Sequence, residues 1–286
     1  MTYSNRKGVR AYLLIAFGLA WVSLVVAWSL GIRAPGANAG LLDYALLIGR
    51  TLPISFAPAI AAFIVRKWIT SEGFQDAGLR LNLRRTWPYF LFAWLYPLLV
   101  IPAVIALATM TRLGVPDYAN LAPGEVAVMM MVAIGTTPIV FGEEFGWRSY
   151  LQIRIFVDRP WLAAMVTGCV WGIWHYPMIL LGYLFPGEPL AGLVLYPINM
   201  AVTSVIYGWL RLKSGSVWSD TLAHSTGNNV ITNLLLSLFG QANWTLMWGG
   251  LRLAVLAVLS AGIILSGQLG RPQRNEASSP FDSPGH

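Results

Sequence analysis

The sequence has little charge and almost no cysteine. Only 11% of its 286 residues are charged, while 56% are hydrophobic; ordinary soluble domains have about 25% charged residues. The single cysteine, Cys169, excludes an intramolecular disulfide. The sequence also lacks a His-Glu-x-x-His run and a Gly-x-Ser-x-Gly run, which argues against a thermolysin-like zinc helix and a serine nucleophile elbow.

Long apolar runs take the place of the missing charge. They are continuous rather than alternating, which favours membrane-spanning helices over a β-barrel. We therefore expect an all-α polytopic membrane protein with about eight transmembrane helices, located in the cell membrane. The first run exceeds the apolar core of a signal peptide and is interpreted as an uncleaved span. The expected spans lie near 11–31, 46–66, 88–110, 125–150, 161–183, 189–210, 216–239 and 244–267.

The distribution of charge supports this map. The net charge of +7 is interpreted as an excess of Lys and Arg in cytoplasmic loops rather than as a nucleic-acid site, so both termini should be cytoplasmic. We expect one membrane-embedded domain over 1–270, with a motif core at 125–235, and a disordered cytoplasmic tail at 271–286. Under this map, one side holds Arg6, Lys7, Arg10, Arg66, Lys67, Arg80, Arg84, Arg85, Arg154, Arg159, Arg211, Lys213, Arg271 and Arg274, and the other holds Arg33, Asp43, Arg112, Asp117, Glu125 and Glu188.

Two adjacent glutamates lie inside the fourth predicted span. A carboxylate in hydrocarbon is costly, so a chain that keeps two of them is expected to use them. Residues four apart share a helix face, which makes Glu144 and Arg148 a predicted ion pair. Glu143 points roughly 100° away from that face, so it is available for a role other than this ion pair. Gly142 and Gly146 flank the pair at a spacing typical of close helix packing.

Two further spans carry histidines. His175 lies in the fifth, and His224 shares a face with Asn228 in the seventh. Helical rise lets all three helices deliver these groups and Glu143 to one depth. Asp220 is one turn from His224 and is either a charge at the helix end or an orienting residue. Other intramembrane polar residues are Asn199 and Arg50, interpreted as structural, and Asn229; the third histidine, His286, ends the chain.

Such a set of residues could hydrolyse a peptide bond. A carboxylate in a partly dry site is a usable general base for water, and an imidazole can position that water or pass on a proton. A second imidazole and an amide can stabilise the tetrahedral oxyanion. The alternative is zinc, with Glu143, His175 and His224 as its ligands. The residues leave the choice open, so the cofactor is unknown.

Three motifs in these spans resemble those of the CPBP family (CAAX proteases and bacteriocin-processing proteins, also called Abi). They are Glu143-Glu144-x-x-x-Arg148, Trp171-x-x-x-His175 and His224-x-x-x-Asn228. The second has Trp171 where the family usually has Phe, and we expect the aromatic packing role to survive. The resemblance covers about residues 125–235.

The resemblance implies an eight-helix intramembrane endopeptidase. Glu143 would activate water with His175, His224 and Asn228 would form the oxyanion hole, and Glu144 and Arg148 would support the site. It implies cleavage near the C-terminus of a membrane-associated or lipidated protein, with membrane lipids as the other partners. Family members are commonly called metalloproteases, although this mechanism needs no metal. Two alternatives remain: a non-catalytic protein of the same fold, in bacteriocin immunity or partner binding, and a proton-coupled transporter, against which the lack of repeated halves counts.

Overall fold

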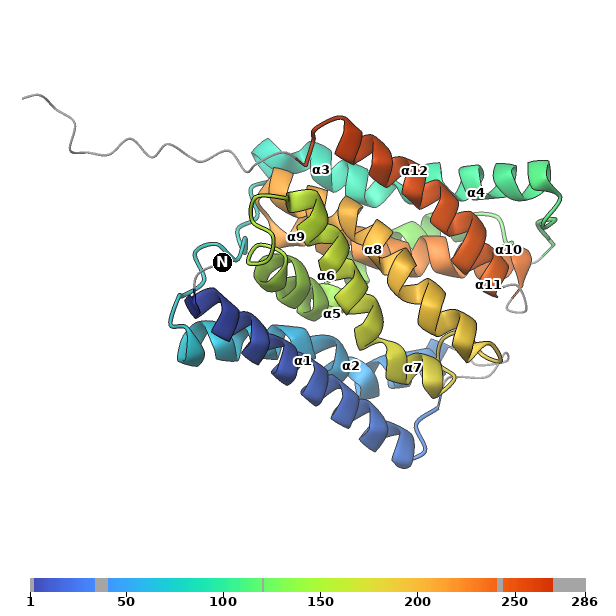
Figure 1. The fold of residues 1–286 in the computed structure, drawn as a ribbon. Coiled ribbons are helices and arrows are strands. Elements are labelled where there is room, and N and C mark those ends of the chain that lie inside the picture. Colours follow the sequence, from blue (N-terminus) through green and yellow to red (C-terminus); the bar gives the residue numbers. More distant parts are fainter. Residues whose placement is uncertain (1–2, 34–40, 120, 241–243, 270–286) are drawn as a thin grey trace, which may run out of the picture.

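The structure is a computed structural model that describes residues 3–33, 41–119, 121–240 and 244–269. All regular elements in these ranges are helices, which confirms the all-α prediction (Figure 1). The α-helices are α1 (Tyr3–Ser29), α2 (Leu41–Ile64), α3 (Leu83–Leu95), α4 (Pro97–Thr111), α5 (Glu125–Gly146), α6 (Pro160–Trp174), α7 (Tyr176–Leu180), α8 (Pro189–Ser214), α9 (Val217–Thr226), α10 (Asn233–Phe239), α11 (Trp244–Leu246) and α12 (Arg252–Leu265). The π-helical turns are η1 (Val65–Ile69), η2 (Trp147–Leu151), η3 (Gly227–Thr232) and η5 (Met247–Leu251).

Six helical segments of the described chain are long and apolar enough to cross a membrane. They are Arg6–Ser29, Leu52–Ile69, Leu83–Thr111, Glu125–Leu151, Pro160–Leu180 and Pro189–Ser214, which confirms a multi-pass membrane protein. The eighth predicted span coincides with a shorter apolar helix, Gly249–Leu265. The seventh is the continuous helical stretch α9–η3–α10, whose polar residues lower its hydropathy. The count of eight and the orientation of the termini therefore stay predictions, and the tail lies outside the described residues.

Prolines divide two of the predicted spans. The span expected at 88–110 is two helices, α3 and α4, which meet at Tyr96 and Pro97. The span expected at 161–183 is also divided, because α6 ends at Trp174 and Pro177 lies in the first turn of α7. Proline lacks the N–H that would continue a helix and disfavours helical backbone in the residue before it. His175 consequently lies at a helix junction instead of within a helix.

Glycines bring the central helices into close contact. A Cβ added at Gly142 of α5 would lie 2.6 Å from the backbone oxygen of Ser55, and one at Gly146 would lie 2.7 Å from the carbonyl carbon of Pro58. This confirms the close packing that their spacing predicted, against α2. Gly168 of α6 faces α8 in the same way, with a Cβ 2.6 Å from Ala201 Cα. The small residues thus place α5 and α6 deep in the bundle.

Three arginines that the charge map places on one side of the membrane are buried and share one acidic segment. Arg66, Arg154 and Arg211 are 0%, 5% and 5% exposed, and all three bind the segment that follows η1. Arg66 pairs with Asp76 at 2.6 Å and Arg211 donates to the Asp76 backbone oxygen at 2.7 Å. Arg154 pairs with Glu72 at 2.7 Å. These contacts tie the ends of α2 and α8 to the turn after η2.

Candidate active site

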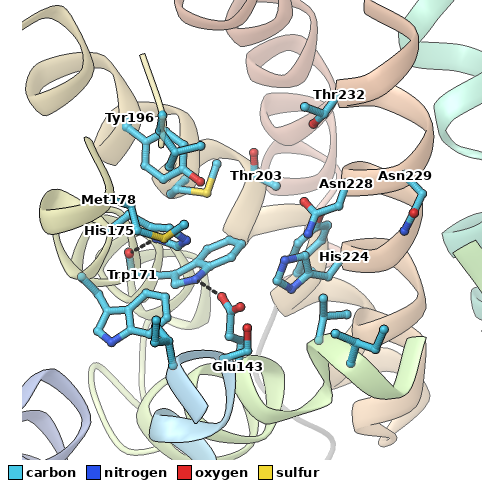
Figure 2. A pocket seen from close by; sticks show the side chains of 18 of the residues that line it. Glu143, Trp171, His175, Met178, Tyr196, Thr203, His224, Asn228, Asn229 and Thr232 are labelled. Carbon is cyan, nitrogen blue, oxygen red and sulfur yellow. Dashed lines mark hydrogen bonds between the residues drawn. The ribbon is translucent and has the colours of Figure 1, made fainter. Parts of the chain in front are cut away.

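A cavity of about 400 Å³ lies among the central helices (Figure 2). Its lining includes Glu143 from α5, His175 from the α6–α7 junction, His224 from α9 and Asn228 from η3. The sequence singled out these four side chains, and the structure brings all of them to one space. Three of them are buried, and Asn228 is exposed.

Glu143 is held by the side chain of Trp171. The indole Nε1 donates a hydrogen bond to Glu143 Oε2 at 2.7 Å (Figure 2). Glu143 as a whole residue is 6% exposed. Glu143 lies in the last turn of α5, close to the start of η2, and Trp171 lies on α6. From the sequence, we expected only a packing role for this aromatic residue. The hydrogen bond was missed, although the indole N–H that distinguishes Trp from the usual Phe was a readable signal.

Trp171 also fills the space between the other polar groups. Its ring contacts that of His224 edge-on at 5.0 Å between centroids and that of His175 at 5.7 Å. The Arg148 guanidinium stacks over it with Cζ 4.4 Å from the ring centroid. One indole therefore fixes the carboxylate and separates the two imidazoles, which makes it the centre of the polar cluster.

Replacing Trp171 by Phe should lower the rate of any reaction that depends on Glu143. Phenylalanine keeps an aromatic ring but loses the N–H, and a hydrogen bond to a charged group is worth about 1.5–3 kcal/mol, or roughly 10- to 100-fold. Turnover in liposomes and thermal unfolding in detergent would measure the effect. Unchanged turnover with unchanged stability would contradict a positioning role. The nearby Trp174→Phe variant is the control, because Trp174 Nε1 binds the backbone oxygen of Ala16 instead.

Glu144 makes two contacts through one oxygen. Its Oε1 accepts from Arg148 Nη1 at 3.1 Å and lies 2.7 Å from His224 Nδ1. Glu144 and Arg148 are both fully buried, and Arg148 Nη2 also donates to Ser204 Oγ at 3.2 Å. The predicted ion pair is present. The second contact joins α5 to α9 and places Glu144 behind His224, so that a carboxylate orients this imidazole.

Asp220 does not orient His224, contrary to one of the two interpretations of the sequence. His224 Nδ1 is taken by Glu144, and neither carboxylate oxygen of Asp220 has a hydrogen-bond partner in the described chain. Asp220 is 0% exposed and lies in the first turn of α9, which agrees with the other interpretation, a charge at the helix end. Sharing a helix face with His224 was not sufficient, because the neighbouring helix α5 supplies a closer carboxylate.

The position of His175 fixes the role of each ring nitrogen. Its Nδ1 lies 2.9 Å from the backbone oxygen of Trp171. A carbonyl oxygen only accepts, so Nδ1 donates and Nε2 of the neutral ring is left as an acceptor. The ring packs edge-on against Trp174 at 4.8 Å and contacts Tyr196 at 5.0 Å. His175 can therefore accept a hydrogen bond from a water molecule in the cavity.

The two adjacent asparagines differ in their partners. Asn229 Nδ2 donates to Thr136 Oγ1 and to the Ser225 backbone oxygen, both at 2.9 Å. Asn228 is more exposed and lies on the His224 side of η3 in Figure 2. Both belong to a π-helical turn, a feature that is common at functional sites. Asn229 is therefore a structural link between α5 and η3, whereas the Asn228 amide faces the cavity.

The polar side chains of the cavity are also a candidate donor set for a metal ion. Within the described residues, no group of three or more His, Cys, Asp or Glu side chains is arranged to hold a metal ion. Glu143, His175 and His224 line one cavity, and their hydrogen bonds use Glu143 Oε2 and the Nδ1 atoms of the two histidines. Because these three side chains are not gathered into such a group, no reaction step is assigned to a metal. Arg50 and His286 add nothing here, because the Arg50 side chain and all of His286 lie outside the described part of the chain.

Comparisons with known proteins match the part of the chain that carries the candidate site residues. Residues 123–231 match the family model described as "Type II CAAX prenyl endopeptidase Rce1-like". The chain is also 25% identical over 131 residues to "CAAX prenyl protease 2" of Methanococcus maripaludis, an alignment that covers 41% of this chain and 46% of that protein. The chain thus spans about half the length of this relative. The resemblance to the CPBP family is confirmed over the residues that carry all three motifs.

Proposed function

Taking this family match as the premise, we propose that the protein is an intramembrane endopeptidase that hydrolyses a peptide bond near the C-terminus of a membrane-associated or lipidated substrate. The main observation behind this proposal is one cavity, to which different helical segments contribute the side chains of Glu143, His175, His224 and Asn228. The names of the matching family and relative, both CAAX prenyl proteases, support this class of substrate. Membrane lipids are the second proposed partner.

The proposed reaction begins at Glu143. Its carboxylate takes a proton from a water molecule that also donates to His175 Nε2, and the resulting hydroxide attacks the carbonyl carbon of the scissile bond. Glu143 then gives the proton to the leaving amine as the C–N bond breaks. The hydrogen bond from Trp171 keeps the carboxylate in one orientation at 2.7 Å. Fixing the base in this way reduces the reorganisation that the reaction would otherwise require.

His224 and Asn228 are the proposed oxyanion donors. Glu144 Oε1 accepts from His224 Nδ1 and holds the ring in one orientation, and in the imidazolium form the Nε2–H donates to the oxyanion. The Asn228 amide supplies the second donor. Arg148 holds Glu144 from the opposite side at 3.1 Å and so fixes the orienting carboxylate. Each supporting residue thus acts on a residue that touches the substrate.

Asn228→Ala should lower kcat more than it raises KM. A donor that acts only on the oxyanion contributes to the transition state and little to substrate binding, and losing one such donor costs roughly 100- to 1,000-fold in kcat. Turnover of a lipidated peptide by purified protein in liposomes measures both constants. A rise in KM at constant kcat would contradict the oxyanion assignment.

The neighbouring Asn229→Ala is the matched control. Asn229 binds Thr136 and Ser225, so its loss should lower the midpoint of thermal unfolding. The kcat of this variant should stay close to that of the wild type. If both variants lose kcat equally at equal stability, the distinction between the two asparagines is wrong.

A further inference from the structure

Three buried arginines hold the turn η2 from outside. This turn ends the continuous helix α5–η2, and the last carbonyl groups of a helix have no partner within it. Arg66 Nη2 donates to the Ser149 backbone oxygen at 2.6 Å, and Arg154 Nη1 donates to the Tyr150 backbone oxygen at 3.0 Å. Arg211 Nε donates to Ser149 Oγ at 3.1 Å. The position of η2 therefore depends on where the three guanidinium groups are held.

Asp76, in the segment that follows η1, contacts all three of these arginines. Its Oδ1 lies 2.6 Å from Arg66 Nη1, and its Oδ2 lies 3.2 Å from Arg154 Nη2. Its backbone oxygen accepts from Arg211 Nη2 at 2.7 Å. The Asp76 side chain is 54% exposed, and Asp76 is not among the residues that line the cavity. A carboxylate at the protein surface thus organises the contacts that hold η2.

The turn η2 also carries a residue of the candidate active site. Arg148 precedes Ser149 in η2 and donates to Glu144 Oε1 at 3.1 Å. The same oxygen lies 2.7 Å from His224 Nδ1. Hydrogen bonds and ion pairs therefore connect Asp76, through the arginines and η2, to the imidazole of His224. Each contact along this path is no longer than 3.2 Å.

We propose that Asp76 is a positioning residue for His224; this inference rests on the proposed function, in which His224 is an oxyanion donor. Without the Asp76 carboxylate, the fully buried Arg66 would lose a counter-charge. A buried cation in that state is unfavourable, so its guanidinium would turn away and release the Ser149 carbonyl. Arg148 would then move with η2. A misplacement of about 1 Å can cost about 100-fold in rate. Asp76 lies outside residues 123–231, so the family match assigns it no role.

Kinetics of variants in the same segment test this inference. Asp76→Asn should lower kcat by about 10- to 100-fold, as expected for a misplaced site group, with little change in KM. Glu72→Gln is the matched control. It also removes a carboxylate, which pairs with Arg154 at 2.7 Å, but it leaves the three contacts of Asp76 in place, so its kcat should stay close to that of the wild type. Asp76→Glu keeps the charge and should recover part of the loss.

Turnover of a lipidated peptide in liposomes gives both constants, and thermal unfolding in detergent shows whether the two proteins are equally folded. Equal kcat values for the Asp76→Asn and Glu72→Gln proteins would overturn the proposal. A rise in KM alone in the Asp76→Asn protein would do so as well, because a positioning residue for an oxyanion donor acts on the transition state.

The NMR signals of the histidine rings test the same inference without turnover. The chain has three histidines, so protein labelled with ¹⁵N in histidine gives few ring signals, and a His175→Asn variant assigns one of them by its loss. The Nδ1 signal of His224 reports the hydrogen bond to Glu144 Oε1. Asp76→Asn should shift this signal, and Glu72→Gln should leave it in place.

The NMR result also separates this inference from the proposed function. A shifted His224 signal in the Asp76→Asn protein alone supports the positioning role even if the wild type cleaves no peptide, a result that would contradict the endopeptidase proposal only. An unchanged signal, or an equal shift in the Glu72→Gln protein, would overturn the positioning role whatever the turnover. If the Asp76→Asn protein does not fold, Asp76→Glu takes its place. It moves the carboxylate by one methylene group and should cause a smaller shift, and no shift would count against the proposal.

Discussion

Glu143→Gln should abolish peptide cleavage while the protein stays folded. Glutamine has nearly the same shape and can still accept the hydrogen bond that Trp171 Nε1 gives at 2.7 Å, but it cannot take a proton from water. Loss of a general base costs about 100- to 10,000-fold in rate. The measurement is turnover of a lipidated peptide by the purified variant in liposomes, together with its thermal unfolding in detergent.

The control for this variant lies on the same helix. Glu125 is in the first turn of α5, where its side chain accepts from the Ala122 backbone N–H at 3.0 Å, and it does not line the cavity. Glu125→Gln should therefore keep its activity. Wild-type turnover by the Glu143→Gln protein would show that another group activates the water.

Arg148→Ala should destabilise the protein by about 3–5 kcal/mol, as expected when one partner of a buried ion pair is removed. Both side chains of the pair are fully buried, and the loss would leave the Glu144 carboxylate without its counter-charge. It would also remove the cation that stacks 4.4 Å from the centre of the Trp171 ring. The midpoint of thermal unfolding in detergent should fall, and expression should fall with it. An unchanged midpoint would contradict the ion pair as a source of stability.

A double variant separates stability from catalysis. Arg148→Met with Glu144→Gln removes both charges, so the stability lost in Arg148→Ala should largely return. Activity should not return, because His224 would still lack the carboxylate that lies 2.7 Å from its Nδ1. Recovery of turnover along with stability would mean that Glu144 and Arg148 serve only the fold.

Helical periodicity predicted which side chains are neighbours on the same helix. The spacing of Glu144 and Arg148 predicted their ion pair, and the shared face of His224 and Asn228 predicted that both line one space. The gathering of Glu143 and His175 in the same cavity could be anticipated from depth alone, since each helix rises by about 1.5 Å per residue. Periodicity fixes such neighbours because it depends only on backbone geometry.

Contacts between helices could not be predicted in the same way. The Glu144–His224 contact needs the packing of α5 on α9, and the sequence does not identify which helices are neighbours. The helix break at His175 follows from Pro177, a signal present in the sequence. The burial of Arg66, Arg154 and Arg211 could not be predicted, because charge alone does not reveal that their acidic partners lie in the segment that follows η1.

The most direct test of the account is cleavage of a lipidated peptide by the purified protein in liposomes prepared in ¹⁸O-water, with the products identified by mass spectrometry. We predict one cut near the C-terminus, with one ¹⁸O atom from the attacking water in the new carboxylate. The Glu143→Gln protein should give no cleavage products. A folded wild-type protein that cleaves no peptide, or that instead carries protons and a solute across the membrane, would contradict it.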